Sequence, residues 1–255
     1  METAVVSEGK PLSQVERVVD AFIAPTKTFT DIRRSASWWL PFVLLAIVTV
    51  ISSFAIDRTV GFAAVAQHEM TKSPAAAEQL QQLPPAERAQ SLKTRTIATR
   101  ISTYASPVFI LVFVLLEALI LWGSFNFGLG AQTTFGQMVA VIMYSALPRL
   151  FVGIMNAIFL FTGVNTENYD LRNPVGTNLG YFLTDSPNWL KTAGAFFDIF
   201  SLWSLVLLVI GTAIIARKTK GQAAIIVVGW WVLILIIATG ATAARTDSTG
   251  RTPLK

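Results

Sequence analysis

Five long apolar runs constrain the fold of this chain more than any other feature of its sequence. Each run has 19 to 24 residues, and together they cover residues 38–56, 107–127, 139–162, 196–216 and 223–242. A helix crosses the hydrocarbon core of a bilayer with roughly 20 residues. Only 14% of the chain is charged, against about 25% in an average soluble domain. The sequence therefore excludes a water-soluble enzyme and predicts an all-α polytopic membrane protein, a bundle of five transmembrane helices.

A polar N-terminal segment, residues 1–37, precedes the first run. Apolar side chains recur in it at helical spacing from Leu12 to Ile23, with Glu16, Arg17 and Asp20 between them, a pattern that indicates an amphipathic helix. Such a helix either lies on the membrane surface or packs against the protein's own membrane domain. The sequence favours neither arrangement over the other.

The five-span domain is predicted to occupy residues 38–242. Its longest interruption is a polar loop at 57–103, whose second half, from Pro85 to Thr103, is rich in helix-forming residues. Residues 243–255, after the last run, are predicted to be a disordered tail.

Basic residues indicate the orientation of the chain in the membrane. Dense basic clusters occur at Arg33-Arg34 and Arg217–Lys220. If each of the five runs crosses the membrane, both clusters lie on the same side of it as the N-terminus. Counted over whole loops, the basic residues favour the opposite orientation, but short clusters beside a span weigh most in the positive-inside rule. We therefore expect a cytoplasmic N-terminus.

Two charged residues lie near the centres of neighbouring runs, Glu117 in the second and Arg149 in the third. A charge in the middle of the bilayer costs ~2.5–3.5 kcal/mol on insertion scales, so each of the two needs a partner or water. A short uncharged turn joins the runs, which favours an interhelical Glu117–Arg149 pair. The pair either fixes the register of two helices or forms a proton-linked or substrate-binding site. The first interpretation is favoured, because a single pair is too little for a proton relay.

Asp198 is the third charged residue within the runs. An apolar stretch follows it as far as Arg217, and a rise of 1.5 Å per residue places Asp198 close to a membrane interface. It either binds a cation or a lipid amine or, in the interpretation that we favour, faces a polar neighbour or a headgroup.

Enzymatic chemistry has little support in this sequence. The chain has no cysteine and a single histidine, His68, in the polar loop. One histidine without cysteine is too few ligands for a zinc site, and any Ser–His–Asp triad would have to use this one histidine. Nucleotide-binding glycine motifs and a basic tract for nucleic acid are also absent. We predict a protein that is not an enzyme and has no cofactor or metal. Its partners are the lipid bilayer and, besides it, other proteins or further copies of the chain.

Several short stretches occur in a recognisable order. They are Ala24–Ile32 (APTKTFTDI), Ser37–Pro41 (SWWLP), Tyr144–Pro148 (YSALP), Leu171–Gly180 (LRNPVGTNLG, with Asn173, Pro174, Asn178 and Gly180), Asp198–Trp203 (DIFSLW) and Gly229–Trp231 (GWW). In this order they resemble the Yip1 family of five-span membrane proteins, in particular its bacterial branch. The resemblance covers residues 12–240, nearly the whole chain.

The resemblance implies an all-α bundle with a cytoplasmic N-terminus, the C-terminus across the membrane and, for a bacterial member, a place in the inner membrane. Eukaryotic relatives associate with Rab-type GTPases and with one another in vesicle transport, but this chain lacks their long N-terminal region. Two hypotheses follow. The chain is a non-enzymatic protein that organises or scaffolds membrane partners, or a small carrier or lipid- or ion-handling protein that uses the Glu117–Arg149 pair and Asp198.

Overall fold

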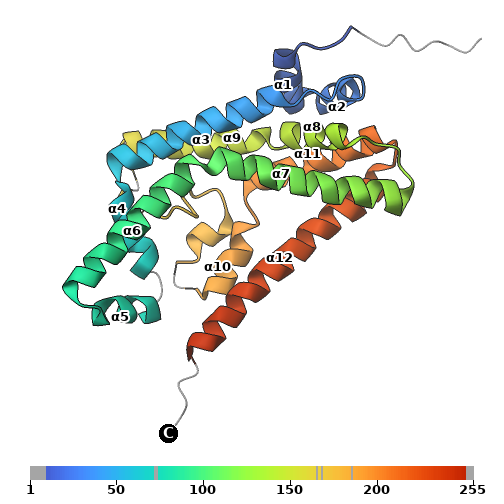
Figure 1. Ribbon diagram of the computed structural model, residues 1–255. Helices are drawn as coiled ribbons and strands as arrows, with labels where there is room; N and C mark the ends of the chain where they lie inside the picture. The colour runs from blue at the N-terminus through green and yellow to red at the C-terminus, as the bar shows by residue number, and fades with distance from the viewer. Residues whose placement is uncertain (1–9, 72–73, 165, 168, 185, 251–255) are drawn as a thin grey trace, which may run out of the picture.

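The computed structural model describes residues 10–71, 74–164, 166–167, 169–184 and 186–250, and the side chains of all these residues except 74–76 and 245–250. Five of the helical segments in these ranges are long and apolar enough to cross a membrane. They are Trp39–Thr59, Ser106–Gly128, Phe135–Phe161, Ile199–Ala216 and Lys220–Ala244. Each overlaps one apolar run, so the predicted all-α, five-span architecture is confirmed (Figure 1).

The first, second and fourth spans are regular helices over nearly their whole length. They are α3 (Trp39–Thr59), α7 (Ser106–Gly123), which a π-helical turn, η1 (Ser124–Gly128), extends, and α11 (Ile199–Ala216). Helix α11 begins three residues later than the run that starts at Phe196. The reason is that Asp198 caps it, since its Oδ1 accepts a hydrogen bond of 2.8 Å from the Ser201 amide.

The fifth span, α12 (Lys220–Gly250), is longer than its apolar run. It continues through residues 243–250, the first part of the segment for which the sequence predicts disorder. Residues Ala241, Ala243 and Ala244 are strong helix formers, and they extend a helix whose costly first turn has already formed. The last five residues of the chain lie outside the described ranges.

The third span is broken in the middle. It consists of α8 (Phe135–Ser145), a 3-10 turn, η2 (Leu147–Arg149), and α9 (Leu150–Phe161). Pro148 causes the break, because it has no amide hydrogen and its ring clashes with the carbonyl group of the preceding turn. Helix α8 is the most enclosed element, since every residue from Met138 to Ser145 is buried.

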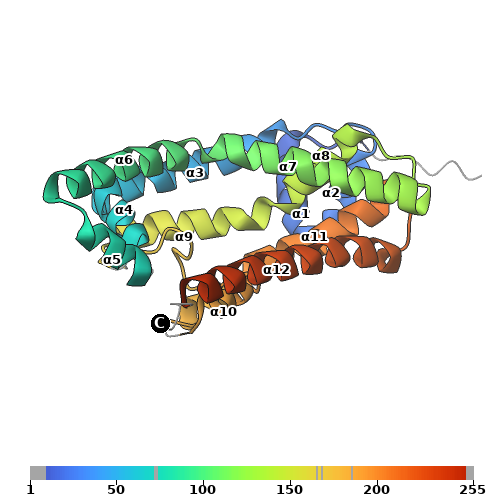
Figure 2. The same ribbon diagram turned by 60° about the horizontal axis from the view of Figure 1, so that its bottom comes forward.

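Close helix contacts place the two halves of the third span. Gly153 of α9 lies against α3, where a Cβ atom would be 2.5 Å from Val48 Cγ1, and Gly211 of α11 lies 2.7 Å from Val141 Cγ1 by the same measure. Small residues allow helix backbones to approach in this way. Helices α3 and α9 therefore run together at one end of the bundle, and α8 and α11 at the other (Figure 2).

Two short N-terminal helices, α1 (Gln14–Ile23) and α2 (Pro25–Ile32), pack against α8 and α11. Ala21, Phe29 and Ile32 have no exposed surface and belong to the main hydrophobic core. Of the two arrangements that the amphipathic pattern allows, the structure thus shows the one in which the helix packs on the membrane domain.

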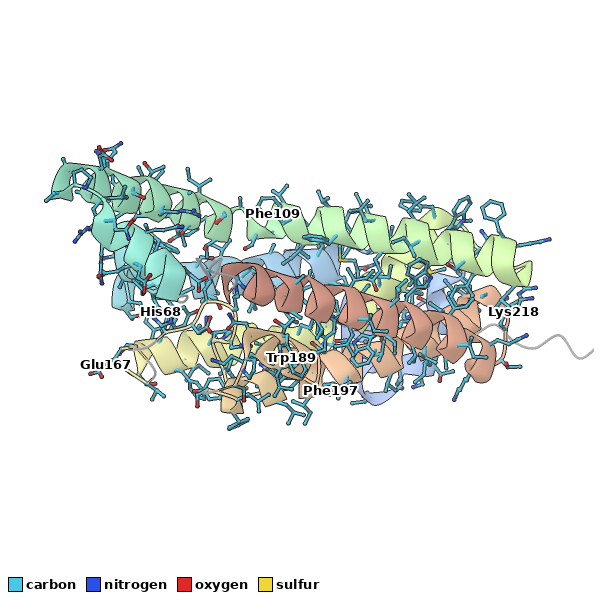
Figure 3. The ribbon with its side chains drawn as sticks, turned by 90° about the horizontal axis from the view of Figure 1, so that it is seen from below. His68, Phe109, Glu167, Trp189, Phe197 and Lys218 are labelled. Atoms are coloured by element: carbon cyan, nitrogen blue, oxygen red, sulfur yellow. The ribbon has the colours of Figure 1, made fainter. Side chains whose placement is uncertain are left out.

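The polar loop folds into three helices at one end of the bundle, α4 (Phe62–Thr71), α5 (Pro74–Gln82) and α6 (Pro85–Tyr104). Helix α6 confirms the helix predicted from Pro85. The connection between the third and fourth spans adds η3 (Leu179–Phe182) and α10 (Asn188–Ala195). His68 and Glu167 lie near one end of the molecule and Lys218 lies at the other (Figure 3).

Candidate functional site

The two central charges, Glu117 of α7 and Arg149 of η2, are both exposed. Among the described residues, neither side chain makes a hydrogen bond or an ion pair of 4.0 Å or less. The predicted Glu117–Arg149 pair is therefore not formed as a direct bond among the described residues.

The end of the second span contacts α12 at Ser124, which belongs to η1 and lies seven residues after Glu117. The Ser124 hydroxyl accepts a hydrogen bond of 3.0 Å from Trp230 Nε1 of α12. Beyond this contact α7 and α12 diverge (Figure 1).

Two further polar groups of the third span were missed by sequence reasoning. Ser145 and Asn156 are 2% and 4% exposed, and the Oγ and Oδ1 atoms have no hydrogen-bond partner among the described residues. Both side chains are buried in the bundle, whereas Arg149 is exposed and belongs to the 3-10 turn that separates α8 from α9. No sequence pattern marks them, because their lack of partners depends on the side chains that surround them in the fold.

The resemblance residues and Asp198 meet in one structural unit at the start of α11. Asp198 accepts a hydrogen bond from the Thr177 hydroxyl, and the Ile199 amide donates to the Thr177 carbonyl at 3.1 Å. Asn178 donates to Asn173 Oδ1 at 3.2 Å and caps η3 by accepting from the Tyr181 amide at 3.0 Å. Asp198 thus faces polar neighbours among the described residues.

Gly180 in the same unit is a point of backbone contact. A Cβ atom there would lie 2.5 Å from the Lys191 carbonyl oxygen and 2.8 Å from the Ala195 nitrogen. Gly194 faces it across the contact, with Gly180 N 2.7 Å from where its own Cβ would be. The pair of glycines lets η3 lie directly on α10, and Pro174 belongs to the turn that leads into this contact.

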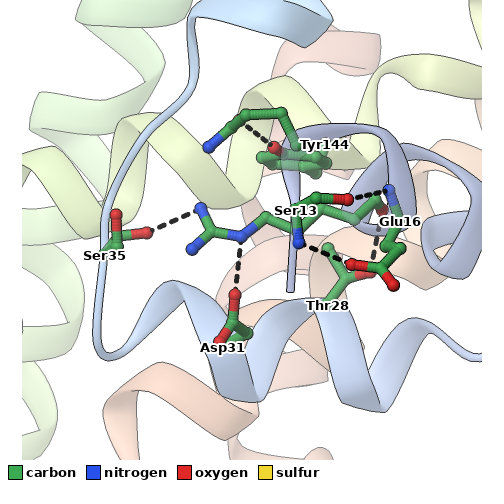
Figure 4. Close-up of polar contacts among 8 residues, drawn as sticks. Ser13, Glu16, Thr28, Asp31, Ser35 and Tyr144 are labelled. Carbon is green, nitrogen blue, oxygen red and sulfur yellow. Dashed lines mark hydrogen bonds and ion pairs between the residues drawn. The ribbon is translucent and has the colours of Figure 1, made fainter. Parts of the chain in front are cut away.

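A buried ion pair joins α1 and α2, and the sequence analysis did not anticipate it (Figure 4). Arg17 Nε donates to Asp31 Oδ2 at 2.6 Å, and the two side chains are 3% and 6% exposed. Arg17 also donates to the Ser35 carbonyl at 2.9 Å, while its own carbonyl accepts from the Thr28 hydroxyl at 2.9 Å.

The same network connects the N-terminal helices to the third span. The Tyr144 hydroxyl of α8 donates to Gln14 Oε1 of α1 at 3.0 Å (Figure 4). At the exposed end of α1, Ser13 and Glu16 form a capping box, and the hydrogen bonds to Ser13 lower the pKa of the Glu16 carboxyl group. A basic residue on the apolar side of an amphipathic helix, fourteen residues before an acidic one, was the available signal for this network.

A cleft of about 520 Å³ lies in the group of helices formed by the polar loop. Arg172 pairs with Glu69 at 3.8 Å on its rim. Where this group meets α3, Arg100 pairs with Asp57 at 2.9 Å, and burial, followed by the charge of Asp57, raises the pKa of Tyr104. Among the described residues, no three His, Asp or Glu side chains lie close enough together to hold a metal ion.

The family model of the Yip1 domain matches residues 19–241. The chain belongs to the Yip1 family. No curated protein and no solved structure matches the chain. The match is to the Yip1 domain as a whole and carries no assignment to its bacterial branch.

The Yip1 match begins inside α1 and ends inside α12, so it includes all five spans. Asp31 and Tyr144 of the buried network lie within it, whereas Arg17 lies just before it. Glu117, Arg149 and the unit around Asp198 also lie within the Yip1 domain.

Proposed function

We propose that this Yip1-type membrane protein is a non-enzymatic organiser that holds a partner protein at the N-terminal end of its bundle. We place it in a bacterial inner membrane with the N-terminus in the cytoplasm, as the basic clusters favour. The observation that carries the proposal is the two-sided construction of α1.

One side of α1 is fixed in the core and the other is left open. Arg17 and Ala21 are buried, and the capping box holds the first turn of the helix. On the open side, Val15, Val19 and Ile23 are 66%, 49% and 75% exposed. Their spacing of four residues makes a continuous apolar row, the α1 stripe, on a rigid element.

The charges beside the α1 stripe favour a protein partner over lipid. Glu16 and Asp20 follow Val15 and Val19, so an acidic row borders the stripe. Helices that lie in a membrane surface usually carry lysine and arginine on the polar side, because bilayers present anionic headgroups. An acidic border instead complements an amphipathic partner helix with basic flanks.

A photo-crosslinking experiment tests the α1 stripe directly. The photoreactive residue p-benzoylphenylalanine replaces Val19 in one variant and Ile225 in the control. Ile225 is also an apolar residue and is 77% exposed, but lies on α12. We expect Val19 to crosslink to a discrete protein in native membranes and Ile225 to crosslink to lipid.

A triple substitution supports the same test. V15S/V19S/I23S should abolish the crosslink from a probe placed at Asp20 while the thermal unfolding midpoint stays near that of the parent, because none of the three side chains is buried. Lipid-only products from Val19, matching those from Ile225, would contradict the organiser proposal. A crosslink to a second copy of the chain would identify the partner as the protein itself.

A second candidate function has support from the third span. Glu117 and Arg149 are unpaired among the described residues, and Ser145 and Asn156 present buried oxygens without partners. We propose, as the alternative, a carrier or lipid- or ion-handling protein that uses these groups. Glu117→Gln should then abolish lipid or solute flux in vesicles without unfolding the protein. Full activity and stability of the E117Q/R149M variant would contradict the alternative.

A further inference from the structure

The connection between the third and fourth spans folds back along the bundle. Its helix α10 packs against α12. Phe197, which follows α10, contacts Trp231 of α12 with the ring centroids 5.6 Å apart, and Phe196 contacts the same ring at 6.0 Å. Trp231 lies near the middle of the apolar run at 223–242. The chain that leads into α11 therefore meets the fifth span near its middle, not at its end.

The figures show the depth of this connection along the spans. Helices α3, α7 and α9 run from left to right in Figure 1, and Figure 3 is turned about that same horizontal axis. Trp189 of α10 lies at about the same position along this axis as Phe109, an exposed residue of the second span (Figure 3). Phe197 lies nearer to Lys218, and Glu167 lies farther from it. Helix α10 is therefore level with the first turns of the second span, whereas α4 and α5 lie beyond them (Figure 1).

Large apolar side chains of the connection are exposed. Leu179 and Phe182 of η3 are 57% and 68% exposed, and Trp189 of α10 is 40% exposed. Exposed apolar side chains that gather on one unit mark a surface that contacts a membrane or another protein. This unit is short and lies between two spans, so its surface requires a cover.

The apolar surface continues onto the fifth span. Beyond Trp231, α12 exposes Leu233, Ile234 and Ile237, and α10 lies beside this half of the helix (Figure 1). A span of this length and composition presents such residues to lipid. The bilayer that covers this half of α12 therefore also covers the neighbouring face of α10.

The polar groups of the connection are satisfied within the protein. Irregular backbone is tolerated at membrane depth only where its polar groups have partners in the protein. Asp198 is 7% exposed and accepts hydrogen bonds from the Thr177 hydroxyl and from a backbone amide of α11. Asn178 is 9% exposed and donates to Asn173. Gly180 lies directly on the backbone of α10. This unit thus has the internal bonding that a segment in a bilayer needs.

The side chains of α10 suit the boundary between headgroups and acyl chains. Tryptophan is enriched at this level, because its ring is apolar and its N–H group is polar. Lys191 is the charged residue of α10, and the long stem of a lysine lets its ammonium group reach the headgroups. Both features favour one leaflet over the centre of the bilayer.

We infer that η3 and α10 form a re-entrant unit inserted into the leaflet on the side of α4, α5 and α6, where Leu179, Phe182 and Trp189 contact phospholipid acyl chains. The unit gives the hydrogen-bonded residues around Asp198 a purpose, because they keep its polar groups away from lipid. The inference is independent of both proposed functions.

Site-directed spin labelling tests the inserted unit. The chain has no cysteine, so Phe182→Cys and Trp189→Cys each give one label site in the full chain. The labelled proteins are placed in vesicles of phosphatidylcholine and phosphatidylglycerol. Collisions of the label are then measured with oxygen, which concentrates in hydrocarbon, and with a water-soluble nickel chelate.

Two exposed positions are the controls, Phe109→Cys in the second span and Glu87→Cys on α6. We expect the ratio of oxygen to nickel collisions at Phe182→Cys and Trp189→Cys to match that at Phe109→Cys, and the ratio at Glu87→Cys to be several-fold lower. A ratio equal to that at Glu87→Cys overturns the inference, because the unit is then in water. Few collisions with either reagent also overturn it, because protein then covers the surface.

A second measurement keeps both aromatic residues in place. The photoreactive residue p-benzoylphenylalanine replaces Leu179, whose side chain is exposed, so the protein should unfold at the temperature of the parent. We expect crosslinks to phospholipid in the same vesicles. A crosslink to a second copy of the chain, or the absence of lipid products, overturns the inference.

Discussion

At the scale of single residues, Gly180 has the least room for change. A methyl group there would meet the backbone atoms of Lys191 and Ala195, which cannot rotate away as a side chain can. We expect Gly180→Ala to lower the free energy of unfolding by about 1–3 kcal/mol, the usual cost of overpacking, measured by denaturant titration in detergent.

Gly229 provides the matched control for this substitution. It lies inside α12 with no heavy atom within 4 Å of its added Cβ. Gly229→Ala should be neutral or stabilise the protein by up to about 1 kcal/mol, because alanine is the better helix former. Equal effects of the two substitutions would contradict the close contact between η3 and α10.

Tyr169 gives a second prediction at this scale. Burial raises its pKa to about 12, although a hydrogen bond with Asn156 acts in the opposite direction. Because the folded pKa lies above the unfolded value of about 10, this tyrosine contributes stability that is complete below pH 10 and lost as the pH rises toward 12. Absorbance of tyrosinate near 295 nm should show a titration near pH 12 that Tyr169→Phe removes. A Tyr169 that titrates at the unfolded value would contradict its burial.

At the scale of elements, the Arg17–Asp31 pair determines whether α1 and α2 stay in the core. Removing one member leaves an uncompensated buried charge, which costs about 3–5 kcal/mol. Arg17→Gln and Asp31→Asn should each lower the unfolding free energy strongly, and the double variant should lose less than the sum of the two.

The Arg100–Asp57 pair is the control for this prediction. Arg100 is 59% exposed, and exposed pairs contribute about 0–1 kcal/mol. Arg100→Gln should therefore have little effect on the unfolding free energy. If Arg17→Gln is as mild as Arg100→Gln, the buried pair does not hold the N-terminal helices in place.

The elements also show how far the sequence predicts this fold. All five spans and helix α6 follow from apolar runs and helix formers, which act through local physics. The partner of Arg17 cannot be predicted in this way, because Asp31 becomes its neighbour only when Pro25 turns the chain back and both helices pack against α8. Asp198 caps α11 through a local bond from the Ser201 amide, but its contact with Thr177 is not local, because the two lie 21 residues apart in the chain. The Ser145 hydroxyl and the Asn156 side-chain oxygen belong to ordinary residues of a span, and only the fold leaves these two atoms without partners among the described residues.

At the scale of the whole molecule, an odd number of spans, five, places the segments before the first span and after the last span on opposite sides of the membrane. The chain has no cysteine, so any introduced cysteine is a unique label site. We expect Ser35→Cys and Gln132→Cys to react with a membrane-impermeant maleimide from one side, and Glu87→Cys from the other. With the N-terminus in the cytoplasm, only Glu87→Cys reacts in intact cells or spheroplasts.

The control for accessibility is labelling after the membrane is permeabilised, when all three exposed positions should react. Reaction of Ser35→Cys in intact cells would reverse the orientation. Reaction of Gln132→Cys and Glu87→Cys from the same side would contradict the five-span topology itself.

The packing of α1 and α2 on α8 and α11 also delays the burial of these two helices during synthesis of the chain. Phe29 packs against the position of Gly211, which the ribosome adds 182 residues later. At the usual elongation rate of 5–20 residues per second, the N-terminal helices wait roughly 10–40 s for their binding surface. During that interval Arg17 and Asp31 remain hydrated, and we expect their burial to follow the synthesis of α11.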